Sequence, residues 1–417
     1  MKRSLLSLAA ALLLTGAALP EQATAQRLRV HCGPTTFVTS AEKAGQMSIS
    51  ADGSLLQLGE TIIATTQIDS ITVDREAYNP LAIAVNYSEA GARLTIPCHL
   101  KDKLTITVDA GKVGFLQATD LQEEVTYTLS GTSANGSFAM DGEYKATLVL
   151  NGLTLTNTAG PAIDIANGKR INVTLPAGTT TTLTDGAGGL HKACFFINGH
   201  AEFDGAGTLV LTGNTKHAYA SDEYTQFKPT FGQMQVAKAA SDGLHIEQYL
   251  QVQGGTFTFA NIAGDNVDVS ITKPPTDTLN GQVFIEGGTL TLNVASDDTK
   301  GMKCDSAMTI TGGTIKATVS GLGTKGISVG TDLLIAQPTT TATLIDMAVT
   351  GTTYMPGDAL LESKCRGIKV KGDFTFDGGT IKISATGTKS KAISVDGDYT
   401  YKSGSINCAV SAANMRF

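Results

Sequence analysis

The sequence predicts an all-β solenoid, in which short strands stack turn upon turn around one continuous core. Two observations predict it: a glycine-rich phrase recurs in the second half of the chain, and polar and apolar residues alternate after each copy. The phrase is Gly-Gly-Thr followed by an apolar residue, and its copies begin at Gly254, Gly287, Gly312 and Gly378. Self-similarity of this kind is typical of repeats that cannot bury their apolar faces alone.

The residues after each glycine pair alternate with a period of two. Residues 256–259 read Thr-Phe-Thr-Phe and residues 289–292 read Thr-Leu-Thr-Leu. This alternation predicts strands that point apolar side chains inward and threonines outward. The glycine pair permits a tight turn where a Cβ would collide or φ must be positive.

A second phrase precedes the first by about ten residues and fixes the size of a turn. It appears at residues 243–245, 301–303, 326–328 and 367–369, each beginning with glycine. Each turn therefore has at least two strands and two corners. The first phrases are spaced by 33, 25 and 66 residues, so the last gap has room for two turns, one of them degenerate.

The chain divides into three parts. Residues 1–25 combine Lys2 and Arg3 with an apolar run and a small-residue site, which predicts a cleaved signal peptide and a secreted, periplasmic or cell-surface protein. Residues 26–140 predict a β-rich N-terminal module that caps the solenoid, and residues 141–417 the solenoid itself. Residues 270–280 and 351–365 are expected to be loops that project from it.

Composition excludes several classes of function. A net charge of −7 argues against nucleic acid and anionic membranes as partners and is compatible with cation binding. No later segment is long and apolar enough to span a membrane. The first of six cysteines is Cys32, so a lipid anchor is not expected, and the absence of a Cys-x-x-Cys pair favours structural cysteines over zinc or redox chemistry.

Five strings in the middle of the chain resemble a known family. They lie at residues 127–133, 150–157, 205–209, 216–218 and 241–245, and in this order they resemble the secreted bacterial carbohydrate-binding domain proteins over residues 125–410. The resemblance implies a right-handed parallel β-helix similar to that of pectate lyases, with calcium bound along the coil. It also implies polysaccharide binding without an established catalytic activity.

The chain departs from the family pattern in one turn. The family commonly has Asp-Gly followed by an aliphatic residue, whereas this chain reads Asp265-Asn266-Val267. Asparagine tolerates a left-handed backbone, so we expect the turn to keep its geometry.

Acidic residues gather where the turns are expected to have corners. Calcium takes six to eight oxygen ligands, and stacked corners place carboxylates about 4.8 Å apart. The alternative is that these residues only form turns on a solvated surface. The candidate calcium ligands are Asp222, Asp242, Asp265, Asp268, Asp297, Asp298 and Asp305.

Histidines and tyrosines near the candidate metal residues suggest a sugar-binding surface. With no tryptophan in the chain, tyrosine must supply any ring that stacks on a sugar. The alternatives are that the rings cover the coil and that the histidines shape corners. The candidate ligand-binding residues are His217, Tyr219, Tyr224, His245 and Tyr249.

The leading hypothesis is a non-catalytic polysaccharide-binding protein stabilised by calcium, with acidic glycans as candidate ligands. A second hypothesis is a calcium-dependent polysaccharide lyase, for which Lys300, Lys303, Arg366 and Lys369 supply basic groups. A third is a structural or adhesin protein whose coil contacts another protein. No residue is assigned a catalytic role.

Overall fold

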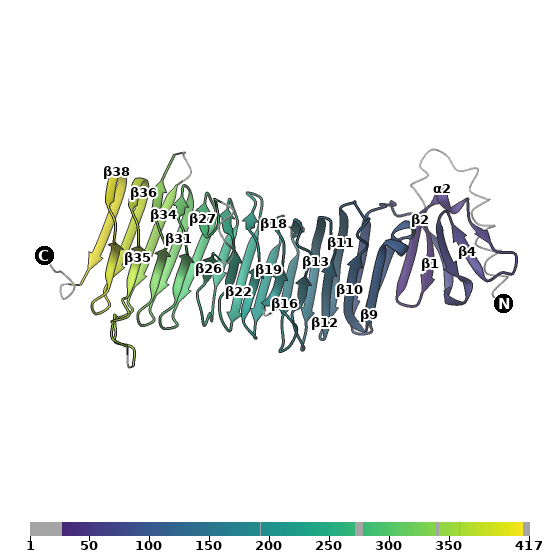
Figure 1. The fold of residues 1–417 in the computed structure, drawn as a ribbon, viewed down its shortest axis with the longest axis horizontal. Coiled ribbons are helices and arrows are strands. Elements are labelled where there is room, and N and C mark those ends of the chain that lie inside the picture. Colours follow the sequence, from purple (N-terminus) through teal and green to yellow (C-terminus); the bar gives the residue numbers. More distant parts are fainter. Residues whose placement is uncertain (1–26, 192, 272–277, 339–341, 358, 412–417) are drawn as a thin grey trace.

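The protein is an elongated all-β stack with its two ends far apart (Figure 1). The computed structural model describes residues 27–191, 193–271, 278–338, 342–357 and 359–411. Long sheets of parallel strands run through most of the chain. The predicted signal peptide, residues 1–25, lies outside the described residues.

Three faces of parallel strands make up the stack. The third face is a sheet of its own. It ends at β9 (Leu104–Asp109), which pairs antiparallel with β10 (Gly111–Gln117). Its parallel strands are β10, β12 (Gly136–Asp141), β14 (Ile163–Ile165), β17 (Ala193–Ile197), β20 (His217–Ser221), β23 (Leu244–Glu247), β26 (Val267–Ser270), β29 (Lys300–Cys304), β32 (Lys325–Val329), β35 (Arg366–Val370) and β37 (Lys391–Val395).

The first and second faces belong to one large sheet because four long strands contribute to both. The first face contains β15 (Ile171–Thr174), β18 (Ala201–Asp204), β21 (Thr225–Phe227), β24 (Tyr249–Val252), β27 (Gln282–Ile285), β30 (Met308–Ile310) and β33 (Leu333–Ala336). The second contains β16 (Thr180–Thr184), β19 (Thr208–Gly213), β22 (Gln233–Ala239), β25 (Thr256–Phe259), β28 (Thr289–Val294), β31 (Gly313–Val319) and β34 (Thr343–Val349). The four long strands are β11 (Val125–Ser133), β13 (Ala146–Thr156), β36 (Phe374–Ala385) and β38 (Tyr399–Val410).

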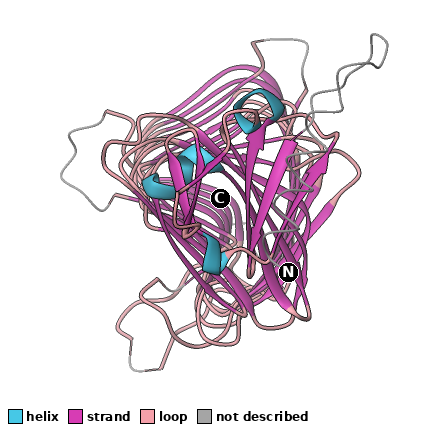
Figure 2. Ribbon diagram, turned by 90° about the vertical axis from the view of Figure 1, so that its right-hand side faces the viewer, coloured by secondary structure: helices cyan, strands magenta, loops and turns pink. Residues whose placement is uncertain are grey.

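Each turn visits the three faces in order. The chain passes from β18 to β19 to β20, and each of these strands pairs in parallel with the strand one turn later, β21, β22 and β23. The end-on view shows the resulting walls of strands (Figure 2). The predicted stacking of repeated turns is present. Each turn has three strands, whereas the sequence indicated at least two.

The degenerate turn predicted between Gly312 and Gly378 is present. β34 pairs with β31 on one side and with β36 on the other, and its sequence lacks the glycine pair. Burial alternates along β28 as the threonine pattern predicted, with the apolar residues inside. The segment 351–365 connects β34 to β35 and contains a bridge between Tyr354 and Ser363.

Glycines of the two phrases are required for different reasons. In the first phrase, a Cβ on Gly254 would lie 2.5 Å from the carbonyl oxygen of Pro229, and Gly255 has a φ of +94°. In the second phrase, Cβ atoms on Gly301 and Gly367 would each lie 2.5 Å from a carbonyl oxygen of the next turn. The second phrase therefore depends on close approach between turns and not on positive φ.

Asn266 occupies the glycine position of the second phrase in its turn, without a positive φ. Gly243 and Gly301, at the equivalent positions of the adjacent turns, also lack a positive φ, so Asn266 keeps the register of the turn without a left-handed backbone. The side chain of Asn266 donates to the carbonyl oxygen of Asn293 at 3.2 Å. The asparagine thus ties one corner to the second face.

The N-terminal module is mostly antiparallel. Its main strands are β1 (Arg27–Cys32), β2 (Thr35–Ser40), β6 (Ser70–Asp74), β7 (Ala82–Ser88) and β8 (Gly91–Pro97). A small separate sheet contains β3 (Ser48–Ile49), β4 (Leu55–Leu58) and β5 (Thr61–Ala64). The helical segments are α2 (Ala41–Ala44), η1 (Thr65–Gln67) and η2 (Cys98–Lys103).

The module joins the stack without a break. β7 pairs in parallel with β11, and β10 pairs in parallel with β12. Parallel stacking thus begins before residue 141, where the sequence analysis placed the boundary. The reason is that antiparallel hairpins at the end of the stack supply strands to the same sheets, which also covers the open edge.

A continuous apolar core runs along the stack. Phe227 packs against Phe231 of its own turn and against Phe203 and Phe257 of the adjacent turns, with ring centroids 4.8–5.0 Å apart. All six cysteines are unpaired; four of them are buried, Cys32 is half-buried and Cys408 is exposed. Within the part of the chain described, no helix has the length and apolarity needed to cross a membrane.

Close packing between turns gives a testable prediction. Gly301→Ala places a Cβ against the carbonyl of Gly326 and is expected to lower the free energy of unfolding by about 1–3 kcal/mol. Gly168→Ala is the control, because the nearest atom to its Cβ is 3.5 Å away. Urea unfolding of both variants measures the difference. Equal stabilities would contradict the account of the second phrase.

Candidate functional site

The outer corner before each third-face strand carries a column of charged residues. These residues occupy the same register position on successive turns, because the strands that follow them pair in register. We call this set the corner column; it comprises His217, Asp242, Asp265, Lys300, Lys325, Arg366 and Lys391. Its residues change from acidic to basic along the stack.

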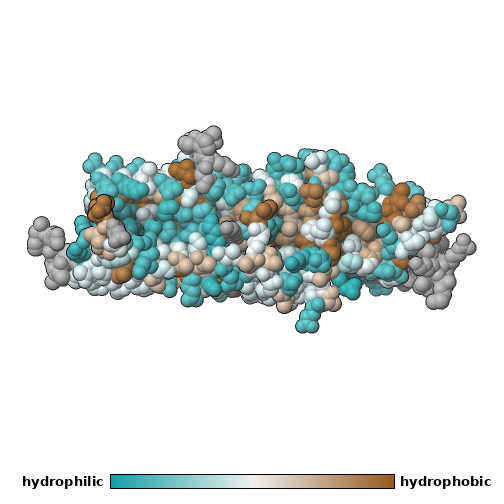
Figure 3. Space-filling view, turned by 60° about the horizontal axis from the view of Figure 1, so that its bottom comes forward, coloured by the Kyte–Doolittle hydropathy of each residue, from teal (hydrophilic) through white to brown (hydrophobic). Residues whose placement is uncertain are grey.

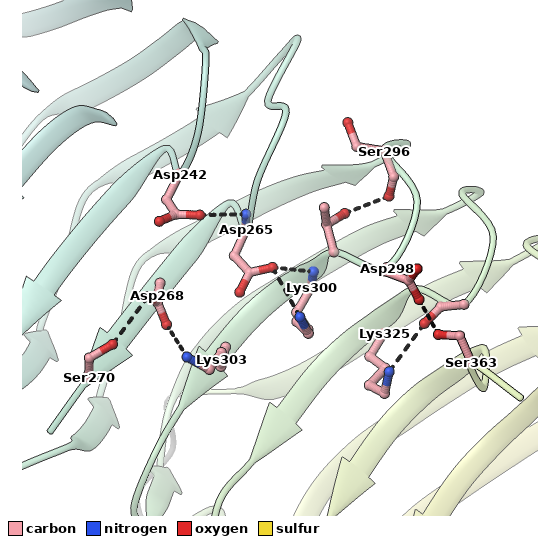
Figure 4. A network of polar contacts seen from close by, with 12 residues as sticks. Asp242, Asp265, Asp268, Ser270, Ser296, Asp298, Lys300, Lys303, Lys325 and Ser363 are labelled. Atoms are coloured by element: carbon pink, nitrogen blue, oxygen red, sulfur yellow. Dashed lines mark hydrogen bonds and ion pairs between the residues drawn. The ribbon is translucent and has the colours of Figure 1, made fainter. Parts of the chain in front are cut away.

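The acidic end of the corner column holds successive turns together. The backbone N–H of Asp265 donates to Oδ1 of Asp242 at 2.8 Å (Figure 4). The backbone N–H of Lys300 donates in the same way to Oδ1 of Asp265 at 2.7 Å. Each aspartate therefore satisfies an amide of the turn that follows it. The Lys300 ammonium lies 3.7 Å from Asp265 Oδ1.

A second row of polar residues lies beside the corner column on the strands themselves. His245, Asp268, Lys303, Ser328 and Lys369 pair in register along β23, β26, β29, β32 and β35. Lys303 Nζ lies 2.8 Å from Asp268 Oδ1 and 3.4 Å from Asp305 Oδ1. The row thus places opposite charges on adjacent turns.

Two histidines and two aspartates meet where the two rows are closest. His217 Nδ1 lies 3.1 Å from Asp242 Oδ2, and His245 Nδ1 lies 3.5 Å from the same oxygen. His245 Nδ1 is also 3.1 Å from Asp268 Oδ2. The two imidazole rings are stacked with centroids 4.4 Å apart. We call these four residues the His-Asp cluster.

The protonation equilibria of the His-Asp cluster are strongly perturbed. Burial would lower the pKa of His245, but hydrogen bonds and charges from Asp242 and Asp268 outweigh it and raise the pKa to about 9. Burial lowers the pKa of His217 despite its contact with Asp242. Burial would raise the pKa of Asp242, yet the two histidines hold it well below its usual range.

The pKa values of the neighbouring carboxyls, Asp265 and Asp268, shift in opposite directions. Burial raises the pKa of Asp265 to about 6, since the Lys300 charge only partly offsets it. Burial also opposes ionisation of Asp268, but its contacts with His245 and Lys303 lower the pKa overall. Asp268 thus stays ionised close to a carboxyl that titrates near neutrality.

The seven predicted calcium ligands do not form one oxygen-rich site. Asp242 and Asp268 face imidazole nitrogens, and Asp265 accepts a backbone N–H. Asp297 accepts the backbone N–H of Leu322 at 2.8 Å, and Asp298, with a φ of +59°, accepts the Tyr354 hydroxyl at 2.6 Å. These contacts fit the alternative role of turn residues.

Asp222 and Asp305 lie at the opposite edge of the third face. Asp222 follows the end of β20, whereas Asp242 precedes β23. Asp305 follows β29 and accepts the backbone N–H of Ile271 at 3.2 Å. Neither can therefore share an ion with the corner column. The sequence spacing placed all seven aspartates at corners but did not distinguish the two edges.

The predicted ligand-binding residues also separate. Tyr219 is fully buried, with its hydroxyl 3.0 Å from that of Thr225, so it offers no face to a sugar, and this corrects the prediction for that residue. Tyr224 and Tyr249 stack on each other with centroids 4.8 Å apart, at the edge away from the His-Asp cluster. This stack continues to His200 at 4.2 Å.

A cavity of about 680 Å³ lies at the basic end of the corner column. Its wall includes Lys364, Arg366, Lys389 and Lys391, with Glu362 as the acidic member. Lys364 and Lys391 are exposed. Sequence reasoning missed Lys364, Lys389 and Lys391. For Lys391 a signal was available, because a basic residue stands directly before the second phrase at Lys300, Lys325 and Arg366, and Lys391 pairs in register with Arg366.

Arg366 is held by backbone carbonyls. Its side chain is 5% exposed, and Nη1 donates to the carbonyl oxygens of Cys365 at 2.6 Å and Lys389 at 3.3 Å. Burial lowers the pKa of the Arg366 guanidinium. The residue therefore orders the cavity wall, and this geometry adds no support for the lyase hypothesis.

A family profile for carbohydrate-binding domain-containing proteins matches residues 117–414. The chain belongs to this family. A carbohydrate-binding domain-containing protein of Acetivibrio thermocellus is 28% identical over 121 residues, which are 26% of this chain and 42% of that relative. The chain thus matches about two fifths of the relative's length.

The fold was also compared with solved structures. The structure of the polysaccharide lyase-like protein from C. thermocellum, a gadolinium derivative, aligns with 79% of this chain and 97% of its own. The TM-score is 0.43 and the sequence identity is 17%.

The raised pKa of His245 predicts a pH-dependent stability. The imidazolium stabilises the fold fully below the unfolded-state pKa of 6.5, and this contribution is lost as the pH rises through about 9. In chelator-treated protein, His245→Gln is expected to lose about 1–3 kcal/mol at pH 6 and much less at pH 9.5. Urea unfolding across this range tests it; a stability difference that stays constant with pH would contradict the assignment.

Proposed function

We propose that the protein binds an acidic polysaccharide at the basic end of its corner column, as a binding protein and not as a catalyst. The observation that carries the proposal is the in-register run of Lys300, Lys325, Arg366 and Lys391 on four successive turns. Membership of the carbohydrate-binding domain family supports a polysaccharide as the partner. The run of cations supports an acidic one.

The spacing of the cations suits a linear polyanion. Successive turns place one basic residue about every 4.8 Å along the axis, which is the separation of neighbouring strands. A chain of carboxylated sugars lying along the axis would pass one basic residue on each turn, of which Lys391 is exposed and Arg366 is buried behind the cavity wall. Because the backbone already holds these basic residues in a row, little conformational freedom is lost when a ligand binds.

Charge around the basic end favours an anion despite the negative net charge of the chain. The acidic partners of the column, Asp242 and Asp265, lie on earlier turns and are already bound to histidines and backbone amides. At the cavity, four cations face one acid, Glu362, which pairs with Lys389. Local concentration of one charge sign steers oppositely charged ligands.

The surface around the stack is compatible with a hydrated ligand. One side seen in space-filling view is mainly hydrophilic, with hydrophobic residues in scattered patches (Figure 3). Acidic polysaccharides are themselves strongly hydrated, so charge and hydrogen bonds are expected to supply more of the affinity than aromatic stacking. The stack of Tyr224 and Tyr249 lies away from the corner column, which agrees with a small contribution from aromatic stacking.

Three finer features belong to the same proposal. The chain winds as a right-handed parallel β-helix, supported by the three-strand turn and by the strong preference of parallel crossovers for that hand. It acts outside the cytoplasm, supported by the signal-like pattern of residues 1–25. Calcium binding stays a prediction, and a calcium titration of the intact protein tests it.

Neutralising the exposed cations of the cavity is expected to weaken binding. The double variant Lys364→Gln, Lys391→Gln should raise the Kd for polygalacturonate about tenfold, since each removed charge contributes roughly 0.5–1 kcal/mol. Affinity should also depend less steeply on salt concentration in the variant. Calorimetric titration at two or more salt concentrations measures both effects.

A matched control removes the same charge from another face. Lys316 and Lys382 are exposed on β31 and β36 of the second face, so Lys316→Gln, Lys382→Gln should leave the Kd within about twofold of the wild type. Equal weakening by both double variants would mean that only net charge matters. Absence of binding to any glycan would favour the structural or adhesin alternative.

A further inference from the structure

We propose that His217, Asp242, His245 and Asp268 form a binding site for one divalent transition-metal ion of the zinc class. The site lies at the acidic end of the corner column and is separate from the basic end proposed to bind polysaccharide. It does not depend on that proposed function. Among the described residues, His217, Asp242 and His245 are the group of metal-ligating side chains whose donor atoms converge within 4.8 Å.

Three of the six separations between the four donor atoms match those around a tetrahedral ion. With zinc-ligand bonds of about 2.0–2.1 Å, neighbouring ligands of a tetrahedron lie about 3.3 Å apart. In the His-Asp cluster the separations from Asp242 Oδ2 to His217 Nδ1 and His245 Nδ1 are 3.1 and 3.5 Å. The separation from His245 Nδ1 to Asp268 Oδ2 is 3.1 Å. All three lie within about 0.2 Å of the tetrahedral value.

The donor types select against calcium. Calcium takes oxygen ligands, whereas imidazole nitrogen suits zinc, copper, nickel and iron. Two neutral imidazoles and two carboxylates also balance the charge of a divalent cation. Two nitrogen and two oxygen donors therefore favour a transition metal over the calcium expected from the sequence.

Contacts behind the donors orient them toward the proposed ion. Asp242 accepts the backbone N–H of Asp265 on Oδ1, which leaves Oδ2 directed at the two histidines. Asp268 pairs with Lys303 through Oδ1 and faces His245 through Oδ2. Such outer contacts fix the direction of ligands in metal sites and raise metal affinity.

His217 presents one ring nitrogen to the cluster. Its side chain is 4% exposed, and Nε2, which points away from the cluster, has no hydrogen-bond partner among the described residues. Nδ1 faces Asp242 Oδ2 and accepts a long contact of 3.4 Å from the backbone N–H of Asp242. Nδ1 is therefore the nitrogen of His217 that would bind the proposed ion. The partly exposed His245, at 25%, leaves the cluster accessible from solvent.

A second histidine-aspartate contact in the chain, His191 with Asp164, lacks the further donor atoms of the His-Asp cluster. His191 lies 2.7 Å from Asp164 through Nδ1 and stacks on Phe196, with centroids 3.8 Å apart. It thus offers one imidazole and one carboxylate on the same third face. Because two ligands hold a metal weakly, this pair serves as the internal control.

The test is a titration of the full chain, freed of metal by chelator, with Zn²⁺, Co²⁺ and Ca²⁺ in separate experiments. We expect one Zn²⁺ per chain by calorimetry and a rise in Tm with added Zn²⁺, because binding stabilises the folded state. Co²⁺ should give the intense visible absorption of a tetrahedral complex. The Zn²⁺ affinity and the Co²⁺ absorption should each fall at least tenfold in His217→Gln and in His245→Gln. Both should be retained in His191→Gln.

Three outcomes overturn the proposal. One is the absence of Zn²⁺ binding to folded wild-type protein. Another is Zn²⁺ binding that survives both cluster variants. The third is Ca²⁺ binding at the cluster that excludes Zn²⁺. Since the variants could also affect folding, circular dichroism of each metal-free variant checks that the loss of binding reflects the ligands. Asp268→Asn is a second, smaller change that should weaken Zn²⁺ binding without removing an imidazole.

Discussion

The constraint on which this protein depends is the in-register stacking of its turns at one strand spacing. Backbone hydrogen bonds link each strand to its equivalent on the next turn, from β20 through β23, β26, β29, β32 and β35 to β37 on the third face. This proximity explains the glycines of the second phrase, whose Cβ atoms would meet carbonyl oxygens of the following turn. Ala392 takes the same position on β37, which is the last third-face strand among the described residues.

Stacking also turns a repeated sequence position into a continuous surface feature. A residue type placed before the second phrase recurs at one corner on every turn, so charge accumulates there in a line. The early turns place carboxylates and imidazoles at this corner, and the later turns place lysine and arginine. One column thus presents two chemically different ends, and the polar contacts drawn in Figure 4 join them through Asp265 and Lys300.

The sequence was sufficient to predict strands, turns and the inward direction of apolar residues, because these depend on local alternation and on glycine. It predicted the extra turn at β34 from spacing alone. It could not assign residues to three faces, because the phrases marked only two strands in each turn. For the same reason Asp222 and Asp242 looked equivalent, although they lie at opposite edges of the third face. Tyr219 was misassigned because one register step separates a surface position from a core position in a strand. The convergence of His217 with His245 depends on side-chain direction across turns, which spacing along the chain does not contain.

The most direct test of the account is to identify which lysines contact the polysaccharide. Carbodiimide couples a glycan carboxylate to a lysine amine fastest where binding holds the two groups together, and mass spectrometry of the digested protein then locates the modified residues. With oligogalacturonate, the account predicts coupling at Lys364 and Lys391 on the cavity wall, competed away by excess unmodified polygalacturonate. Coupling concentrated at Lys316 and Lys382 on the second face, with the cavity lysines unmodified, would contradict it.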